Sequence, residues 1–446
     1  MPRPRRRSSL AATGLTVLLA VATPALTADF VALTGHGGPI KGVDISNDGT
    51  RALTASFDYA IGLWDLADPA EPRWLDGHRA AVNTVLFLPD GRVVSGSDDF
   101  DLRIWDLESG ESRALSGHRG KVMALAYSAD AGLIASAAWD GWIGLWSASD
   151  GSLVHLLKGH QSNVNDVAFA EDGRVLYSAS SDGTIRTWDV ADGQQQRRVL
   201  SHGFGINQIV LNEAAGWLAY GALDGGTRAV ALSDGRQLAD LTLDRRPILA
   251  MTANPAGTEL AVGDGEGHIM VVDTRSWTIT RDFRAAKRGP VWALDYGADG
   301  QNVLAGGLDD AAFYWPVAAG AVAPLSEGER TFLNDPDTME NGARQFYRKC
   351  SICHTLTPDG ARRAGPTLHN VIGRPAGTVP GYAYSDALTG LDLVWTEETI
   401  ARLFEIGPDD YTPGSKMPMQ RIAREADRDD LVAFLKSHAE TAEGSE

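Results

Sequence analysis

Residues 159–189 read GHQSNVNDVAFAEDGRVLYSASSDGTIRTWD. A Gly-His pair opens this segment, and Trp188 ends it six residues after Asp182. Short apolar runs between these landmarks are separated by Asp172-Gly173 and Asp182-Gly183. Asp-Gly between apolar runs is typical of tight hairpin turns. The segment therefore predicts a unit of four short strands joined by tight turns.

The same unit recurs with a period of about 41 residues, which indicates an internal structural repeat. Its histidines are His36, His78, His118, His160 and His202. Its aspartates and the tryptophans that follow them are Asp58 and Trp64, Asp99 and Trp105, Asp140 and Trp146, and Asp182 and Trp188. In three later units the corresponding pairs are Asp224 and Val230, Glu266 and Val272, and Asp309 and Trp315. The first two of these later units have drifted, and the last one recovers the pattern.

These residues resemble the WD-repeat β-propeller family over residues 30–320. The resemblance implies an all-β, seven-bladed WD-repeat propeller at residues 29–318, in which the strand at 30–33 completes the seventh blade and closes the ring. It also implies that the histidine, aspartate and tryptophan of each unit join a hydroxyl group in a buried network. We therefore expect these histidines to be structural, and the propeller to serve as a platform for docking proteins.

Composition narrows the class of protein further. Of the 446 residues, 43% are hydrophobic and 22% are charged, which is ordinary for globular domains. The 58 acidic residues outnumber the 40 basic ones, and the formal charge of −18 argues against nucleic acid as a partner. Cysteine occurs only at Cys350 and Cys353, so the chain is no disulfide scaffold.

Residues 1–28 are typical of a secretory signal peptide. Four arginines lie within residues 3–7, an apolar stretch covers 10–21, and small residues around Ala28 suit cleavage. The apolar stretch is short for a membrane span, although an uncleaved N-terminal anchor is the alternative. We expect an exported, periplasmic protein with no integral membrane segment in its mature chain. Loss of the four arginines would change the formal charge from −18 to −22.

The pattern changes after residue 318. Residues 319–337 predict a linker, 338–440 a helical domain and 441–446 an acidic tail. A helix is expected over 338–354, ending in the C-x-x-C-H motif of Cys350, Cys353 and His354. Two thiols at this spacing attach haem covalently, and the adjoining histidine can bind its iron. A redox disulfide is the alternative, but no strand–helix–strand pattern surrounds the motif.

From this motif onward the chain resembles class I cytochrome c, an all-α domain, over residues 338–440. Residues 365–369 read GPTLH, 12 residues past His354. In that family a proline carbonyl, here that of Pro366, accepts a hydrogen bond from the proximal histidine. The resemblance places further residues at the propionate end of one haem c: Arg374, Tyr382, Tyr384 and Trp395.

The second axial ligand is expected in the loop that reads YTPGSKMP at residues 411–418. It matches the methionine loop of the family, and Met417 is the expected iron ligand, with Met419 as the alternative. Histidine and thioether ligation raises the reduction potential and leaves no open coordination position. The chain departs from the family at Phe404, often a tyrosine, and at Asp409 and Asp410, where mitochondrial cytochromes have lysines.

We therefore expect an exported electron-transfer protein that carries one electron on a covalently bound haem c, with iron ligated by His354 and Met417. Residues 331–446 contain 12 basic and 18 acidic residues, so a redox partner is expected to present a basic surface. No catalytic residue is assigned. Two alternatives stay open. One is an oxidoreductase whose propeller binds a second cofactor or a substrate, and the other is a regulatory or assembly protein that senses redox state through the haem.

Overall fold

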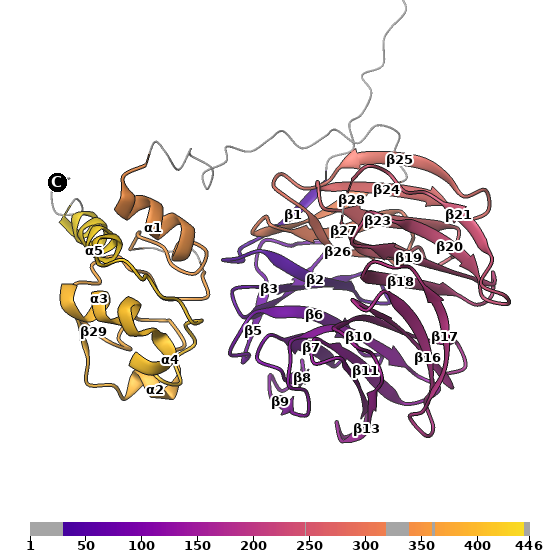
Figure 1. The fold of residues 1–446 in the computed structure, drawn as a ribbon, viewed down its shortest axis with the longest axis horizontal. Coiled ribbons are helices and arrows are strands. Elements are labelled where there is room, and N and C mark those ends of the chain that lie inside the picture. Colours follow the sequence, from indigo (N-terminus) through magenta and orange to yellow (C-terminus); the bar gives the residue numbers. More distant parts are fainter. Residues whose placement is uncertain (1–29, 246, 318–338, 359–361, 441–446) are drawn as a thin grey trace, which may run out of the picture.

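The structure is a computed structural model that describes residues 30–245, 247–317, 339–358 and 362–440. The predicted signal peptide (1–28), linker (319–337) and acidic tail (441–446) lie outside the described residues. The described part consists of a large β domain and a smaller helical domain beside it (Figure 1). Each is built from its own hydrophobic clusters.

Seven four-stranded antiparallel sheets form the β domain within the described residues. The first blade contains β2 (Ile40–Ile45), β3 (Arg51–Ser56), β4 (Ala60–Asp65) and β5 (Arg73–Asp76). The second contains β6 (Val82–Phe87), β7 (Val93–Ser97), β8 (Leu102–Trp105) and β9 (Ser112–Leu115). The third contains β10 (Val122–Ser128), β11 (Leu133–Ala138), β12 (Trp142–Ser147) and β13 (Leu153–Lys158). The fourth contains β14 (Val164–Phe169), β15 (Val175–Ser180), β16 (Thr184–Asp189) and β17 (Gln195–Ser201).

The last three blades follow the same plan. The fifth contains β18 (Ile206–Asn212), β19 (Trp217–Ala222), β20 (Thr227–Ala231) and β21 (Gln237–Asp240). The sixth contains β22 (Ile248–Ala253), β23 (Glu259–Asp264), β24 (His268–Asp273) and β25 (Thr278–Arg284). The seventh contains β26 (Val291–Tyr296), β27 (Asn302–Gly307), β28 (Ala311–Pro316) and β1 (Val31–Thr34). The expected seven-bladed propeller is thereby confirmed.

The N-terminal strand closes the ring, as the sequence predicted. β1 pairs antiparallel with β28, with Val31 opposite Tyr314 and Thr34 opposite Ala311. A carboxylate strengthens the closure, because Asp295 Oδ2 in blade seven accepts a hydrogen bond of 2.8 Å from the amide of Ile45 in blade one. Pairing both ends of the β domain in one sheet removes the exposed edges that an open array would leave.

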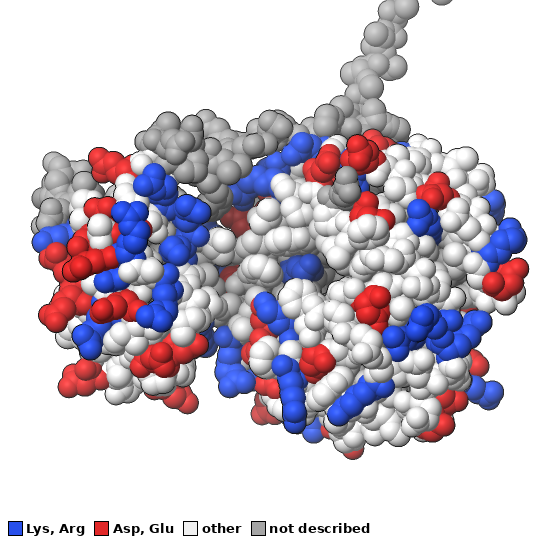
Figure 2. All heavy atoms as spheres, in the orientation of Figure 1, with Lys and Arg blue, Asp and Glu red and all other residues white. Residues whose placement is uncertain are grey.

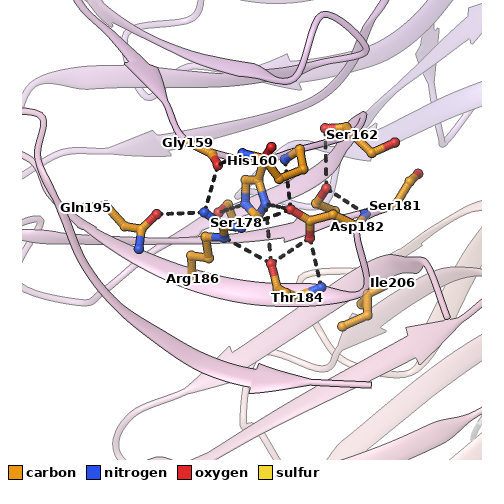
Figure 3. A network of polar contacts seen from close by, with 12 residues as sticks. Gly159, His160, Ser162, Ser178, Ser181, Asp182, Thr184, Arg186, Gln195 and Ile206 are labelled. Carbon is orange, nitrogen blue, oxygen red and sulfur yellow. Dashed lines mark hydrogen bonds and ion pairs between the residues drawn. The ribbon is translucent and has the colours of Figure 1, made fainter. Parts of the chain in front are cut away.

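Each of the first four units, which keep the full repeat pattern, holds the buried network that the resemblance implied. In blade four, His160 Nε2 lies 2.7 Å from Ser178 Oγ, and His160 Nδ1 lies 2.8 Å from Asp182 Oδ2 (Figure 3). Trp188 Nε1 lies 2.8 Å from the same hydroxyl oxygen. The indole donates to the hydroxyl, the hydroxyl to Nε2, and Nδ1–H to the carboxylate. Thr54, Ser95 and Ser136 take the place of Ser178 in the first three blades. These histidines are fully occupied with structural bonds.

In the drifted blades, different side chains take the places of the buried hydroxyl and carboxylate groups. In blade five, Tyr220 stands where the hydroxyl residue would be, and its ring packs on His202. In blade six, Glu266 holds the position of the repeat aspartate, but its side chain is exposed. The carboxylate of Asp264, two positions earlier, is buried instead, accepts hydrogen bonds from the backbone, and pairs with Arg245 at 3.2 Å.

The helical domain contains α1 (Asn341–Lys349), α2 (Asp386–Thr389), α3 (Glu397–Ile406), α4 (Pro408–Tyr411) and α5 (Glu425–Glu440), with a two-residue pairing of β29 (Arg374–Pro375) and β30 (Val394–Trp395). α1 crosses α5 closely because Gly342 has no side chain, and a Cβ there would overlap the carbonyl of Asp430. Thr396 begins α3 with a capping box. Phe346, Leu403 and Leu431 join these helices in one core.

Candidate functional site

One pocket in the helical domain gathers all nine residues that the sequence predicted for a functional site. They are Cys350, Cys353, His354, Pro366, Arg374, Tyr382, Tyr384, Trp395 and Met417. The rest of its wall is largely apolar, with Leu368, Val371 and Leu403 among the contributing side chains. Residues separated by up to 67 positions in the sequence therefore meet around one cavity.

The two cysteines begin the pocket at the end of α1. The helix stops at Lys349, earlier than the expected end at 354, and Cys350 is its C-cap. The carbonyl of Cys350 accepts hydrogen bonds from the amides of both Cys353, at 2.9 Å, and His354, at 2.8 Å. This turn brings both thiols to the pocket wall as free cysteines. Burial raises the pKa of the Cys350 thiol to about 12, so the thiol is neutral.

The ring of His354 is held by the GPTLH segment. Its Nδ1 lies 2.7 Å from the carbonyl oxygen of Pro366, so Nδ1–H donates and the lone pair is left on Nε2. Gly365 packs against the ring so closely that a Cβ would overlap it. Burial lowers the pKa of His354, which keeps the imidazole neutral. A neutral imidazole with its lone pair on Nε2 is the form that binds a metal.

Met417 reaches the same pocket from the loop after α4. The loop is fixed by hydrogen bonds from the amide of Thr412 to Pro408, at 2.9 Å, and from the amide of Ser415 to Thr412, at 3.0 Å. Gly414 turns the chain with a φ of +81°, a conformation that favours glycine. Met417 packs partly buried on the core of the helical domain, whereas Met419 is 48% exposed and lies outside the pocket wall.

The residues expected at the propionate end bind the protein backbone. Arg374 donates to the carbonyls of His369, at 2.9 Å, and Thr367, at 2.7 Å, and so ties down the segment that carries Pro366. The Tyr382 hydroxyl donates to the carbonyl of Ala364. The amide of Val379 donates to the Tyr384 hydroxyl at 3.3 Å. The residue opposite Arg374 across β29 and β30 is Trp395.

Among the wall residues that the sequence did not predict, one comes from the propeller. Tyr59 belongs to the first blade of the propeller, yet it lines the same pocket as Cys353 and Met417. The available signal was its position, because Tyr59 directly follows the turn aspartate Asp58, where Gly141 and Gly183 stand in two other blades. That signal marks an unusual turn but does not tell which segment the side chain would meet.

The donor set fits a haem and does not fit a bare metal ion. Within the described residues, no group of three or more His, Cys, Asp and Glu side chains could hold a metal. His354 and Met417 supply one nitrogen and one thioether donor to an apolar cavity, and two thiols lie next to the histidine. An iron held by only two protein donors needs the four nitrogens of a porphyrin, and the thiols are placed to bind that porphyrin covalently.

Fold and site together define a haem protein of the electron-transfer type joined to a WD-repeat propeller. Comparison with family models supports both halves: "WD domain, G-beta repeat" matches residues 30–65, 71–106, 110–147 and 151–189, and "Cytochrome c" matches residues 339–439. Through this second region the chain belongs to the cytochrome c family. Covalently bound haem c is the cofactor that this membership implies.

Relatives among known proteins match the helical domain. Cytochrome c of Gibberella zeae is 39% identical over 98 residues, which are 22% of this chain and 92% of the relative. Cytochrome c of Sesamum indicum is 36% identical over 23% of this chain and 90% of the relative. A cytochrome c homolog of Rickettsia felis is 34% identical over 26% of this chain and 73% of the relative.

Among the helices that the structure describes, none has the length and apolar character of a membrane span.

Proposed function

We propose that this protein is an exported one-electron carrier whose propeller docks its redox partner or assembles it into a complex. The observation that carries the proposal is the meeting of Cys350, Cys353, His354 and Met417 at one apolar pocket. When bound, the haem supplies an iron that takes up and releases one electron. The protein supplies the covalent anchor, the two axial donors and an apolar wall that keeps water from the iron.

The roles of the pocket residues follow from their contacts. His354 would hold the iron through Nε2, because the bond to Pro366 leaves that nitrogen free. Met417 would supply the second donor, since it packs on the core of the helical domain and lines the same pocket. Arg374 and Tyr382 hold the backbone that carries Pro366 and Ala364. With both donors bound the iron would have no open position, so the haem would exchange electrons and would not activate oxygen.

Export is proposed from residues 1–28 and from the chemistry of the thiols. The N-terminal sequence has the basic, apolar and small-residue regions of a signal peptide. Covalent haem attachment needs both thiols accessible before the chain folds, because Cys350 is buried in the folded domain. Expression without residues 2–28 should therefore yield a chain without covalent haem. Recovery of covalent haem from such cytoplasmic material would contradict the compartment.

The partner is proposed to present a basic surface. Asp409 and Asp410 are exposed on α4, directly before the loop that carries Met417. Figure 2 shows acidic side chains gathered on the edge of the helical domain that faces away from the propeller. Opposite charge speeds encounter, and salt weakens this effect because the Debye length falls to about 8 Å at physiological ionic strength.

Charge reversal tests the sign of this surface. Electron transfer with the native partner should slow as salt rises, and Asp409→Lys with Asp410→Lys should slow it at low salt by about tenfold. Asp234→Lys, on an exposed turn of the fifth blade, is the matched control. Faster reaction of the double variant would mean that the partner surface is acidic.

One observation favours the alternative of an enzyme. The central channel of the propeller is a cavity of about 480 Å³ whose wall includes Lys41, Asp44, Asp295 and Trp292. A hollow of this size that combines an aromatic side chain with a few polar groups is in the range of small-molecule sites. An optical spectrum and a cofactor analysis of protein isolated from its native host separate the two functions. A pure c-type spectrum supports the electron carrier, and any second chromophore or bound cofactor supports the enzyme.

A further inference from the structure

Tyr59 occupies a backbone position that a tyrosine rarely adopts. It has a φ of +71°, and blades three to six have glycine at the equivalent place: Gly141, Gly183, Gly225 and Gly267. Side chains with a Cβ are disfavoured in this region, because the Cβ comes too close to the backbone carbonyl oxygen. Phe100 has a similar φ of +72° at the equivalent turn of blade two, so the contacts of Tyr59, and not its backbone conformation alone, indicate what its side chain does.

Those contacts lead to the pocket of the helical domain. The Tyr59 hydroxyl donates to the backbone carbonyl of Lys416 at 3.2 Å, and the next residue is Met417. Tyr59 also lines the pocket beside Cys353 and Tyr382. The first blade thus covers one side of the pocket at the loop that carries the methionine.

A second contact fastens the same two domains a short distance away. Arg362 of the helical domain pairs with Asp76 and approaches Asp58 with its Nε 3.5 Å from Oδ2. Its guanidinium lies 4.8 Å from the ring centroid of Trp74, within the range of a cation–π interaction. One arginine therefore meets two carboxylates and an aromatic ring of the first blade, a combination that holds it in one place.

The first blade has the shape that this approach requires. The Arg363 guanidinium donates to the carbonyl of Gly37 at 2.5 Å, and a Cβ on Gly37 would overlap the carbonyl of Arg362. The equivalent position, after the repeat histidine, holds Arg79, Arg119 and Gln161 in the next three blades. Their amides still bond to the turn aspartates, as Gly37 does to Asp58. These three blades therefore accept a larger residue at this place, whereas the approach of Arg362 leaves no room for a side chain on Gly37.

We propose that the first blade of the propeller is the built-in docking surface of the haem pocket, and that a protein redox partner reaches this side of the pocket only when the two domains separate. The proposal rests on the proposed function, because it assigns to the same site a contact that controls access. The contact is held by a few charged groups beside a polar cavity that both domains line, so it can open without unfolding either domain. The propeller then acts as a cover as well as a platform.

Substitutions in the propeller alone test the proposal on the full-length, haem-loaded protein. Gly37→Arg introduces the side chain that blades two and three carry at this place, and should separate the domains while the blade stays folded. Tyr59→Gly removes the covering side chain and relieves the unusual φ. Phe100→Gly is the matched control, because Phe100 has a φ of +72° at the equivalent turn of blade two and is absent from the pocket wall.

Two measurements decide the outcome. Small-angle X-ray scattering should show a larger radius of gyration for Gly37→Arg than for the unchanged protein and the control. Stopped-flow oxidation of the ferrous haem by azurin, a protein oxidant, should become about tenfold faster for Gly37→Arg and Tyr59→Gly, because the open population rises. Equal scattering profiles and equal rates in all four proteins would overturn the proposal.

A charge exchange gives a second, independent reading. Arg362→Glu should open the contact in the same way, and adding Asp76→Arg should restore a large part of the closed state in scattering. No restoration would mean that this pair does not hold the domains. The haem spectrum of each variant separates the two proposals: a preparation without c-type haem contradicts the proposed function, whereas scattering reports docking in either case.

Discussion

The Nδ1 atom of His354 lies 2.7 Å from the carbonyl oxygen of Pro366, while the glycine before that proline packs directly on the imidazole ring. The hydrogen bond selects the tautomer with its lone pair on Nε2. The missing side chain of Gly365 lets the backbone come close enough to make that bond. The two neighbouring residues together fix the orientation of an imidazole ring that comes from a different segment of the chain.

Gly365→Ala should therefore disturb the ring without touching either cysteine. The added methyl group overlaps the imidazole, so the segment must shift and the bond from Nδ1 must weaken. Overpacking of this kind costs about 1–3 kcal/mol of unfolding free energy. A weaker bond makes the imidazole less basic and should raise the reduction potential. Redox titration and thermal unfolding of the haem-loaded protein measure both effects.

Gly390→Ala is the control for this prediction. A Cβ at Gly390 meets only the carbonyl of Asp386, at an ordinary 3.7 Å, and the φ of Gly390 is −97°. Both the potential and the stability of this variant should match those of the unchanged protein. A Gly365→Ala variant that is equally unaffected would mean that residue 365 does not position the histidine.

The second prediction concerns Met417. Replacing it with alanine removes the thioether, so the weak far-red iron–sulfur band should disappear and the reduction potential should fall, because the thioether favours ferrous iron. Met419→Ala is the control, since Met419 is 48% exposed and is not part of the pocket wall. Loss of the band in the control, with the band retained in Met417→Ala, would identify Met419 as the ligand.

Local motifs made most of this architecture predictable. The Gly-His, Asp and Trp landmarks recur at regular spacing because each blade must satisfy the same buried groups, so seven blades and their closure could be counted from the sequence. The residues from Cys350 to Met417 could be assigned to one site because their spacing matches a known family. In each case the residues that meet a physical requirement form a short motif that can be recognised in the sequence.

The features that the sequence did not predict depend on contacts between distant segments, or on local hydrogen bonds that no motif encodes. In the drifted sixth blade the buried carboxylate is that of Asp264, which bonds the turn and meets Arg245, and the repeat pattern gives no signal for it. The helix before the haem motif ends at Lys349, where the Ser351 amide bonds to the carbonyl of Phe346, five residues back, and the Ser351 hydroxyl takes the carbonyl of Tyr347. Tyr59 meets Lys416 across 357 residues of sequence, and nothing local encodes that pairing.

The third prediction uses the acid sensitivity of the blade networks. Burial opposes ionisation of Asp99, but hydrogen bonds from His78, at 2.9 Å, and from the amide of Arg79, at 2.8 Å, outweigh it and lower the pKa to about 2. A carboxyl with a lowered pKa in the folded state stabilises the protein above its unfolded pKa of about 4. That contribution, about 2 kcal/mol, is lost as the pH falls towards 2.

Asp99→Asn should thus lower the unfolding free energy at pH 7 and flatten its decline between pH 4 and pH 2. Denaturant titrations across this range give both quantities. Glu266→Gln, which neutralises an exposed carboxylate at the equivalent place in blade six, should leave the decline unchanged. If Asp99→Asn and the unchanged protein lose stability in parallel below pH 4, the carboxylate is not the sensitive group.

Asp166 should show the opposite dependence on pH. It lies in the wall of the central channel, where burial raises its pKa to about 7, although its Oδ2 accepts a hydrogen bond of 2.8 Å from the amide of Ile209 in the next blade. A carboxyl with a raised pKa in the folded state stabilises the protein below its unfolded pKa of about 4, and this stability is lost as the pH rises towards 7. Asp166→Asn keeps an oxygen that can accept from Ile209 and removes the charge that burial disfavours. The variant should therefore gain stability relative to the unchanged protein between pH 4 and pH 8, on the order of 2 kcal/mol.

Unfolding measured at pH 4.5 and pH 8 decides the sign of this effect, with Asp172→Asn on an exposed turn of the same blade as the control. A variant that is less stable than the unchanged protein at pH 8 would mean that Asp166 is ionised at little cost in the channel wall.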